Sequence, residues 1–589
     1  MSARRRTAAV KQAPSNVDET IAVGEGAEAF VALLAAHGVR YLFLNPGTDT
    51  FPVQEAIVKR HALERPTPQV IVCPHESVAL HAAYGYFMVS GQPQAVMVHV
   101  DVGTANAVGA LLNCQRGRVA VLFCAGRTPV TEGGEMRGSR STQVHWIQEQ
   151  RDQNGLVRGF VKWDYELRRN ENIGTVVHRA FQVATTEPPG PVYLALPREL
   201  LMEPRTEIQV PCLAQHLPAA SPQADPEALQ TAARWLAEAK APLIITDYVG
   251  RHPEAVPALV ELAELLSAPV IDGRTRANFP VQHPLHLGYE PQPFLAEADV
   301  ILLLDCDVPY VRSPSVRPAP TARTVHIDID VVKQDIPIWG FPVDLSIQAD
   351  CRKAIPALTA ALRPLVRRSA AREARRAQLE ATHRSQRESW NKEALDATHR
   401  RPITPEWLAY CLNEVTGPDC LFLDEVVTNS PVAARYLQHV GQGNYFRSGG
   451  SCLGWALGAA LGAKLAAPEK TVVCLLGDGG FMYCQPVSAL WAADKHHAPF
   501  LTVVFNNHVY HAVKRATKAG YPEGYSVMSQ DFGACDLDPP PDYALVARAC
   551  RAHGETVTDP DQVVPALRRA LEQVRGGRAA VVDVQIQKP

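Results

Sequence analysis

Short apolar runs alternate with longer amphipathic stretches along most of this chain. The runs have the length of buried strands, and the stretches between them place apolar residues at helical spacing. Such alternation is typical of β-α units that build parallel sheets, because helices cover both faces of these sheets and leave the strands apolar. The pattern occurs in three blocks, so the sequence predicts an α/β fold with three doubly wound parallel-sheet domains.

Changes in composition set the predicted domain boundaries. Residues 1–26 begin with a basic, polar stretch that predicts a flexible tail. The first block covers residues 27–201, the middle block 225–365 and the third block 403–589. Residues 366–402 are rich in Ala, Arg, Glu and Gln, which predicts a charged, solvated linker helix. An RNA-binding arm is the alternative for this segment, but acidic residues interrupt its positive charge.

Composition narrows the expected partners and compartment. The 589-residue chain is 46% hydrophobic and 20% charged, which is enough material for several cores. Its formal net charge of -3 provides no global positive field, so nucleic acid is not an expected partner. The sequence contains no run of about 18 apolar residues, so it predicts no membrane-spanning helix. Thirteen cysteines without a C-x-x-C pair indicate buried thiols in a reducing compartment, so we expect a cytoplasmic protein.

A glycine-rich turn follows an apolar run in the third block. The strand-like "TVVCLL" leads directly into Gly477, Asp478, Gly479 and Gly480. Glycines let the backbone approach a ligand closely, and a turn that opens a helix points several N–H groups at one place, which suits a phosphate. Taken alone, the turn is also compatible with an ordinary connection between a strand and a helix.

A pair of asparagines follows the next apolar run. The segment "FLTVVFNN" ends in Asn506 and Asn507, and twenty-six residues separate Gly479 from Asn506. The carboxyl ends of parallel strands meet at one edge of a sheet, so we expect these amides near Asp478. A carboxylate, an amide oxygen and a backbone carbonyl, completed by diphosphate oxygens and water, form an all-oxygen shell suited to Mg²⁺. Asparagines after a strand are otherwise common turn formers.

Together these two motifs resemble the binding signature of thiamine diphosphate enzymes, in which GDG is followed some two dozen residues later by NN. The resemblance implies thiamine diphosphate and Mg²⁺ as cofactors. It implies that the side chains of Asp478 and Asn507 and the main-chain carbonyl of Val509 hold the metal ion. It also places Tyr510 and His511 at the mouth of the cofactor site.

The first block contains a glutamate that fits the same resemblance. In "CPHESVALHAAYGYFMVSG", Glu76 opens an apolar helix, where the helix dipole alone would favour an acidic residue. The segment nearly matches the family's E-x-x-A-x-x-x-A-x-G-Y helix. The resemblance implies that Glu76 is the carboxylate that bonds ring atom N1′ of the cofactor and drives ionisation of its C2. In this family the glutamate and the diphosphate site belong to different subunits, which implies a homodimer or homotetramer with active sites between subunits.

Two further segments resemble cofactor contacts of the family. "FRSGGSCLGWALG" resembles the stretch beneath the bent cofactor, with Leu453 under the bend and the Ser451 carbonyl accepting from the 4′-amino group. A small-residue helix packed on a sheet is a second explanation for the glycines and alanines that follow. "DEVVTNS" resembles the loop that meets the diphosphate, with Thr428 and Asn429 as donors.

The order of the blocks resembles the pyruvate oxidase, acetolactate synthase and benzoylformate decarboxylase group, which has pyrimidine-binding, middle and diphosphate-binding domains in that order. In "LNPGTDTFP", Thr48 matches the active-site serine of benzoylformate decarboxylase, and in "HVDVGTANA", His99 matches its catalytic histidine. A strand-end histidine bonded to a backbone carbonyl is the alternative for His99. Arg127 stands where the group has a glutamine, and it could pair with a substrate carboxylate.

The resemblance therefore implies a lyase or transferase that decarboxylates a 2-oxo acid, with possible carboligation. An acetolactate synthase-like carboligase is the alternative within the group. A flavin-bearing oxidase is a third reading, because the middle domain could host FAD, although its sequence carries no dinucleotide fingerprint. A non-catalytic nucleotide or CoA binding protein is the alternative from another class, and it has no need of Glu76.

Overall fold

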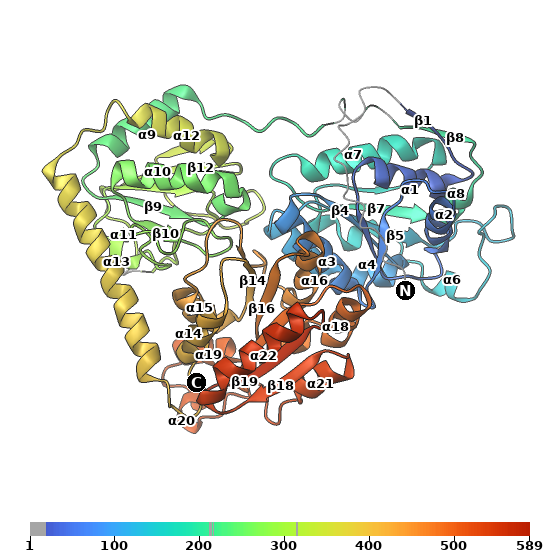
Figure 1. Ribbon diagram of the computed structural model, residues 1–589. Coiled ribbons are helices and arrows are strands. Elements are labelled where there is room, and N and C mark those ends of the chain that lie inside the picture. The colour runs from blue at the N-terminus through green and yellow to red at the C-terminus, as the bar shows by residue number, and fades with distance from the viewer. Residues whose placement is uncertain (1–18, 211, 213–214, 216, 314–315) are drawn as a thin grey trace. The chain divides into compact units, whose positions relative to one another are not determined.

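The computed structural model describes residues 19–210, 212, 215, 217–313 and 316–589. Its ribbon contains three parallel sheets with helices on their faces (Figure 1). This confirms the predicted α/β class with three doubly wound sheets. The chain divides into two compact units. Unit 1 is formed by the described residues of 19–72, 92–111 and 119–220, and unit 2 by those of 73–91, 112–118 and 221–589.

Unit 1 contains a six-stranded parallel sheet in the order β3-β2-β4-β5-β7-β6. Its central strands are buried along their whole length because helices cover them, which explains their apolar composition. The strands are β2 Tyr41–Leu44, β3 Gln69–Val72, β4 Gln94–Val98, β5 Val121–Arg127, β6 Asp164–Glu166 and β7 Val192–Pro197. The helices are α1 Gly26–Ala36, α2 Phe51–Ala62, α4 Val100–Asn106, α6 Val144–Ile147, α7 Ile173–Thr185 and α8 Arg198–Met202, while α5 Val108–Arg116 runs from unit 1 into unit 2.

The predicted flexible tail is too long. Residues 1–18 lie outside the described residues, but β1 (Glu19–Ala22) pairs antiparallel with β8 (Glu207–Val210). Helix α1 begins at Gly26, immediately after this ladder. The backbone hydrogen bonds of β1 are therefore satisfied by a segment that the sequence presents as a polar linker, which is why local composition did not reveal the strand.

The middle sheet of unit 2 has five parallel strands in the order β10-β9-β11-β12-β13. The strands are β9 Pro242–Thr246, β10 Val270–Asp272, β11 Val300–Leu304, β12 Arg323–Asp328 and β13 Leu345–Gln348. The helices of this region are α9 Pro226–Glu238, α10 Val256–Leu266, α11 Gln292–Leu295 and α12 Cys351–Leu362. Asp225 caps α9 by accepting the Ala228 N–H at 2.9 Å, so the helix begins where the preceding proline-rich segment ends.

The second sheet of unit 2 is six-stranded and parallel, in the order β15-β14-β16-β17-β19-β18. Its strands are β14 Cys420–Glu425, β15 Tyr445–Phe446, β16 Thr471–Gly477, β17 Leu501–Asn506, β18 His553–Val557 and β19 Ala580–Gln585. Its helices are α14 Pro405–Val415, α15 Ser430–Tyr436, α16 Ala456–Ala466, α17 Asp478–Tyr483, α18 Pro486–Lys495, α19 His511–Gly520, α20 Tyr525–Ser529, α21 Tyr543–Ala549 and α22 Val563–Arg575.

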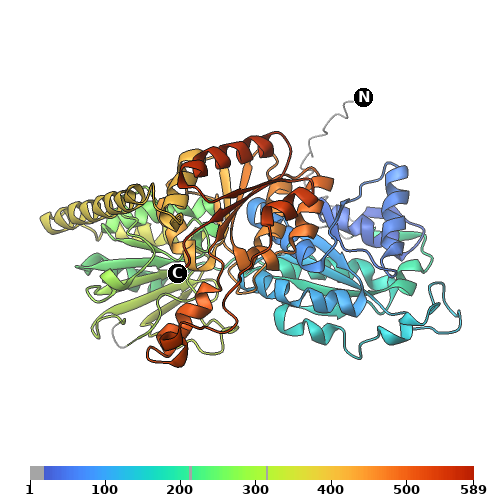
Figure 2. The ribbon, with the colours of Figure 1, turned by 90° about the horizontal axis from the view of Figure 1, so that it is seen from below.

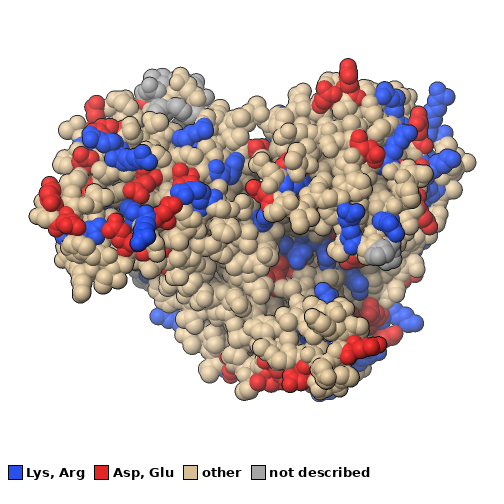
Figure 3. Space-filling model, turned by 180° about the vertical axis from the view of Figure 1, so that it is seen from behind, with Lys and Arg blue, Asp and Glu red and all other residues tan. Residues whose placement is uncertain are grey.

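A long helix, α13 (Ala370–Asp396), joins the two sheets of unit 2 and forms the charged segment between them (Figures 1 and 2). Ser369 caps its first turn, and only Leu379 and Ala394 are buried along its length. On the face drawn in Figure 3, acidic and basic side chains lie close to one another in several patches. Among the described residues, none of the helices is long and apolar enough to cross a membrane.

Helix α3 (Glu76–Ser90) lies in unit 2 and packs closely against α16. A Cβ added at Gly85 would overlap the backbone carbonyl of Ala459, and one at Gly462 would overlap the carbonyl of Ala82. The two glycines therefore let the helix backbones touch, one from each side of the contact. The small-residue pattern that follows Leu453 has this packing role.

Candidate functional site

The glycine-rich turn lies where β16 ends and α17 begins. Asp478 is the first residue of α17 and is only 5% exposed. Its Oδ1 accepts the Gly479 N–H at 2.8 Å, and its Oδ2 accepts the His508 N–H at 2.7 Å. Burial raises the pKa of Asp478, although the N–H groups of Gly479 and His508 oppose this shift. The carboxylate is thus held in one orientation at a place where a cation would stabilise it.

The two asparagines at the end of β17 have different environments. Asn506 is fully buried, and its Nδ2 donates to Asp583 of β19 at 3.0 Å. Asn507 follows the strand, and its Oδ1 accepts the Val509 N–H at 3.0 Å. β16 and β17 are parallel neighbours, so Asp478 and Asn507 lie at the same edge of the sheet. The Asn506 side chain therefore bonds within the sheet, and the Asn507 side chain is the one that lies beside the glycine-rich turn.

The residues of this edge fit a diphosphate held through Mg²⁺. A carboxylate, an amide and a backbone carbonyl from Val509 are all hard oxygen donors. A Cβ at Gly479 would lie 2.5 Å from Cε1 of Tyr510, so glycine at this position lets the Tyr510 ring pack against the turn. Among the described residues no cluster of three or more His, Cys, Asp or Glu could hold a metal, and this set uses only one carboxylate.

A buried glutamate that our sequence reasoning missed organises the adjoining loop. Glu425 ends β14 and accepts the N–H groups of Gly454, Trp455 and Ala456, at 2.9, 3.2 and 2.9 Å. These are the orphan donors at the start of α16, whose N-cap position provides no side-chain cap. Burial raises the pKa of Glu425 to about 7. Glu425 thereby fixes the chain immediately after Leu453, and an acidic residue at a buried strand end was its only signal in the sequence.

Asn113 holds the other end of the same loop. Its Oδ1 accepts the Cys452 N–H at 3.1 Å, and its Nδ2 donates to the Cys452 carbonyl at 2.8 Å. The same Nδ2 lies 3.2 Å from Nε2 of His81 on α3. Burial lowers the pKa of His81 to about 3, so this ring is neutral. The loop that contains Ser451 and Leu453 is therefore tied to α3 by one buried amide.

Glu76 begins that helix. It is 7% exposed, and the preceding His75 caps the helix by accepting the Ser77 N–H at 3.2 Å. Thr428 and Asn429 lie in a short 3₁₀ turn, Val427–Asn429, directly after β14. Unit 2 thus contains the glycine-rich turn, the Leu453 loop, Thr428 and Asn429, and the helix that starts at Glu76.

In unit 1, Thr48 follows β2, His99 follows β4, and Arg127 is the last residue of β5. These three strands are neighbours in the sheet. The Thr48 carbonyl accepts from Nη1 of Arg198 at 3.3 Å. His99 lies against the carboxylate of Asp49. Nε of Arg127 lies 3.2 Å from Oε2 of Glu166, so this guanidinium already has a carboxylate partner on its own sheet. His511 begins α19, and burial lowers its pKa.

Three family models match successive parts of the chain. Residues 24–156 match the N-terminal TPP binding domain of thiamine pyrophosphate enzymes, residues 229–358 the central domain, and residues 426–584 the C-terminal TPP binding domain. The chain belongs to the thiamine pyrophosphate enzyme family.

Relatives of this thiamine pyrophosphate enzyme have several names. It is 25% identical over 575 residues to a probable acetolactate synthase large subunit of Methanocaldococcus jannaschii, covering 93% of this chain and 90% of that one. It is 27% identical over 596 residues to a sulfoacetaldehyde acetyltransferase of Rhodobacter capsulatus, covering 95% and 94%. In fold it is similar to a thiamine diphosphate-dependent 4-hydroxybenzoylformate decarboxylase of Rhodococcus jostii RHA1, with a TM-score of 0.78, 22% identity, and coverage of 96% and 99%. It is also similar to benzoylformate decarboxylase from Polynucleobacter necessarius, with a TM-score of 0.77, 19% identity, and coverage of 96% and 99%.

The middle sheet of this thiamine pyrophosphate enzyme has charged side chains at its carboxyl edge, where doubly wound sheets receive dinucleotides. Nζ of Lys333 lies 2.5 Å from Asp328 and 2.8 Å from Asp307. Arg118 lies 2.8 Å from Asp307 and 3.2 Å from Asp328, and the neighbouring Asp305 is also buried. These ion pairs occupy the edge with the chain's own side chains, so the residues present do not fit FAD there.

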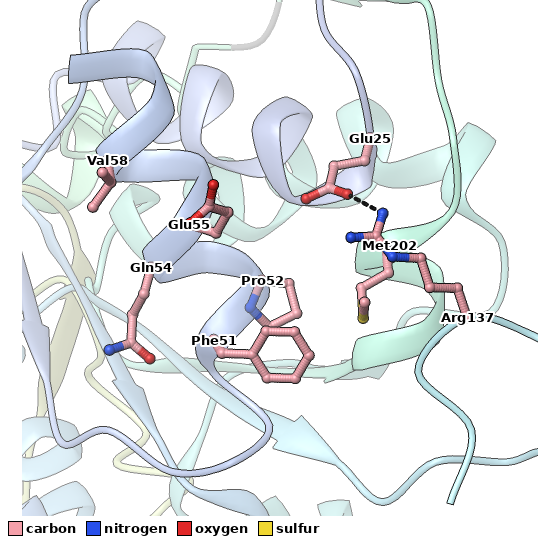
Figure 4. Close-up of a pocket in the computed structure, with 8 residues that line it drawn as sticks. All are labelled: Glu25, Phe51, Pro52, Gln54, Glu55, Val58, Arg137 and Met202. Carbon is pink, nitrogen blue, oxygen red and sulfur yellow. Dashed lines mark hydrogen bonds and ion pairs between the residues drawn. The ribbon is translucent and has the colours of Figure 1, made fainter. Parts of the chain in front are cut away.

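An open pocket of about 370 Å³ lies beside the start of α2 in unit 1 (Figure 4). Phe51 and Pro52 form one side of it, and Glu25 and Arg137 form an ion pair of 3.2 Å across another. None of Thr48, His99 and Arg127 lines this pocket. The predicted catalytic residues of unit 1 instead follow the strand ends.

Proposed function

We propose that this enzyme uses thiamine diphosphate and Mg²⁺ to decarboxylate a 2-oxo acid, as a benzoylformate decarboxylase-like lyase. The observation that carries the proposal is the oriented, buried carboxylate of Asp478 beside Asn507, in a chain whose three domains all match this family. When bound, thiamine diphosphate supplies an electron sink for the pair released with CO₂.

The residues of unit 2 have binding and proton-transfer roles in this proposal. Asp478, Asn507 and the Val509 carbonyl hold Mg²⁺, and the N–H groups of residues 477–480 with Thr428 and Asn429 bind the diphosphate. Glu76 holds a proton at N1′ of the pyrimidine, and the Ser451 carbonyl accepts from its 4′-amino group. Leu453 supports the bend, and Tyr510 and His511 border the cofactor.

The residues of unit 1 act on the substrate in the same proposal. His99 gives a proton to the developing oxyanion, takes a proton from water, and then gives it to the carbon left by CO₂, because a histidine can both donate and accept protons near neutral pH. Thr48 binds the substrate carbonyl region. Nε of Arg127 pairs with Glu166, so Arg127 binds the substrate carboxylate through its terminal guanidinium nitrogens. A second copy of the chain completes the site.

A carboligase is the second candidate, because two relatives that match 93% and 95% of this chain are named acetolactate synthase and acetyltransferase. In that case a second carbonyl compound intercepts the reaction before His99 protonates carbon. A non-catalytic binding protein is disfavoured, because such a protein has no use for a buried glutamate at the start of α3.

The test incubates the purified chain with thiamine diphosphate, Mg²⁺ and a panel of 2-oxo acids, and follows CO₂ and organic products. Aldehyde as the only product supports the lyase, and 2-hydroxyketone or acetohydroxy acid supports the carboligase. Glu76→Gln is the matched control, and it is expected to abolish CO₂ release. Turnover by none of the 2-oxo acids, with no cofactor binding in a titration, would reject both candidates.

A further inference from the structure

His99 has a carboxylate neighbour that belongs to a different loop. His99 follows β4, and Asp49 lies in the loop between β2 and α2. β2 and β4 are parallel neighbours, so their carboxyl ends lie side by side. Nδ1 of His99 contacts Oδ1 of Asp49, with 24% of the histidine side chain and 3% of the aspartate side chain exposed. The ring therefore has one edge buried against Asp49 and another that reaches solvent.

Two glycines leave the space that this pair fills. A Cβ at Gly47 would overlap Nδ1 of His99, and a Cβ at Gly126 would overlap Oδ2 of Asp49. Thr50 fixes the loop, since its Oγ1 donates to the Gly47 carbonyl at 2.9 Å and accepts the Gly47 N–H at 3.1 Å. Side chains on either glycine would separate the carboxylate from the ring, so the backbone is shaped around their contact.

Asp49 is buried beside His99. Among the described residues, its Oδ1 contacts Nδ1 of His99 and its Oδ2 has no hydrogen-bond partner, while the positive charge of Arg198 also acts on this side chain. Removing one member of a buried hydrogen-bonded pair leaves the other poorly compensated. The pair is therefore a coupled unit rather than a chance surface contact.

The groups that face His99 act mostly in one direction. The hydrogen bond and charge of Asp49 raise the pKa of His99, burial lowers it, and a hydrogen bond with Gln148 and the charge of Asp101 raise it further. His145 is a further neighbour, and its own pKa is lowered by burial and by the positive charges of Arg198 and Arg140. The net direction for His99 is upward, and Asp49 is the largest cause.

We propose that Asp49 is a positioning residue that fixes the tautomer of His99, so that Nδ1–H is donated to Asp49 and Nε2 is the atom that exchanges protons with substrate. The proposal rests on the proposed function for the role of that exchange. Nε2–H loses its proton to an oxygen or carbon of the reacting substrate, and Nε2 takes a proton back from water, while Nδ1 keeps its proton and its hydrogen bond to Asp49.

The first measurement needs neither cofactor nor substrate. Long-range ¹⁵N–¹H spectra of protein labelled in histidine report the protonation and tautomer of each ring, and His99→Gln identifies the signals of His99. We expect neutral His99 of the wild-type chain to have its proton on Nδ1. A neutral ring with its proton on Nε2 would overturn the proposal without any variant at Asp49.

The second measurement compares Asp49→Asn with Asp101→Asn, which removes an acidic neighbour that does not bond the ring. Asp49→Asn should shift the midpoint of the His99 titration to lower pH by about tenfold or more in proton concentration, and Asp101→Asn should shift it less. An unchanged midpoint in a folded Asp49→Asn protein would overturn the proposal, as would equal shifts in the two variants.

Activity separates this proposal from the proposed function. With a 2-oxo acid that is turned over, Asp49→Asn should lower kcat more than it raises KM and should move the pH profile of kcat/KM in the direction of the His99 titration. If spectra support the pair but no 2-oxo acid is turned over, the proposed function fails and the positioning role stands. If turnover occurs and the pH profile of kcat/KM is the same in Asp49→Asn as in the wild type, the positioning role fails.

Discussion

Alanine at position 85 should weaken the packing of the helix that begins at Glu76. The Cβ of Gly85→Ala would overlap the backbone carbonyl of Ala459, which cannot rotate away as a side chain could. Relief requires α3 and α16 to separate along their contact. Overpacking of a core costs about 1–3 kcal/mol, and a clash with backbone belongs at the upper end, so we expect unit 2 to lose about 3 kcal/mol of its free energy of unfolding.

Urea unfolding followed by tryptophan fluorescence measures this effect. Trp455 is fully buried, and its ring meets Tyr84 edge-on at 5.6 Å, so its emission reports on the α3–α16 contact. Gly520→Ala is the matched control, because a Cβ there meets no atom within 4 Å. The control should unfold at or slightly above the wild-type urea concentration. Equal midpoints for Gly85→Ala and the control would refute the packing argument.

Three other changes test different parts of the structure. Because the pKa of Glu425 is raised from 4.5 to about 7 in the folded chain, the free energy of unfolding of wild type relative to Glu425→Gln should fall as pH rises from about 4.5 to about 7, by up to about 3 kcal/mol. Paired urea titrations across that range measure it, and a difference that rises with pH would contradict it. Lys333→Met should destabilise the middle sheet by about 3–5 kcal/mol in thermal or urea unfolding, because Asp328 and Asp307 lose a buried partner; a neutral result would show that Arg118 alone compensates both acids. Asp478→Asn should reduce thiamine diphosphate affinity about tenfold or more in a titration and remove its dependence on Mg²⁺, and retained Mg²⁺ dependence would exclude Asp478 as a ligand.

Local sequence was sufficient to predict the parts of this protein that depend on order along the chain. The alternation of apolar runs and helices predicted three parallel sheets because buried strands need apolar residues on both faces. The GDG turn and the asparagines were predictable as one site because each directly follows a strand, and β16 and β17 are neighbours. The start of α14 is also determined locally, because Oγ1 of Thr404 accepts the Trp407 N–H at 3.2 Å.

Residues that act across long sequence distances were not predictable in this way. Asn113 bonds Cys452, and Glu425 bonds the start of α16, through contacts that exist only once the sheets have formed. Asp49 stands next to Thr48 in the printed sequence, but its role depends on the neighbouring strand that delivers His99. The grouping of residues 73–91 with unit 2 also depends on glycine contacts between distant helices.

The carboxyl edge of the middle sheet is a second feature that depends on residues far apart in the sequence. The buried Asp305 and Asp328, the half-buried Asp307 and their basic partners come from separate segments, and each alone resembles a solvated charge in the sequence. Only their assembly reveals that the edge is filled by ion pairs, which removes the reason to expect FAD there.

The role of Glu76 in ionising C2 of bound thiamine diphosphate is tested most directly by the exchange of the C2 proton for deuterium. Quenched-flow NMR measures this exchange with the cofactor bound in the presence of Mg²⁺. We expect the wild-type chain to accelerate the exchange by about 10²-fold or more over free cofactor, and Glu76→Gln to bind the cofactor but lose the acceleration. Exchange in the wild-type chain at the rate of free cofactor, or equal acceleration by Glu76→Gln, would contradict it.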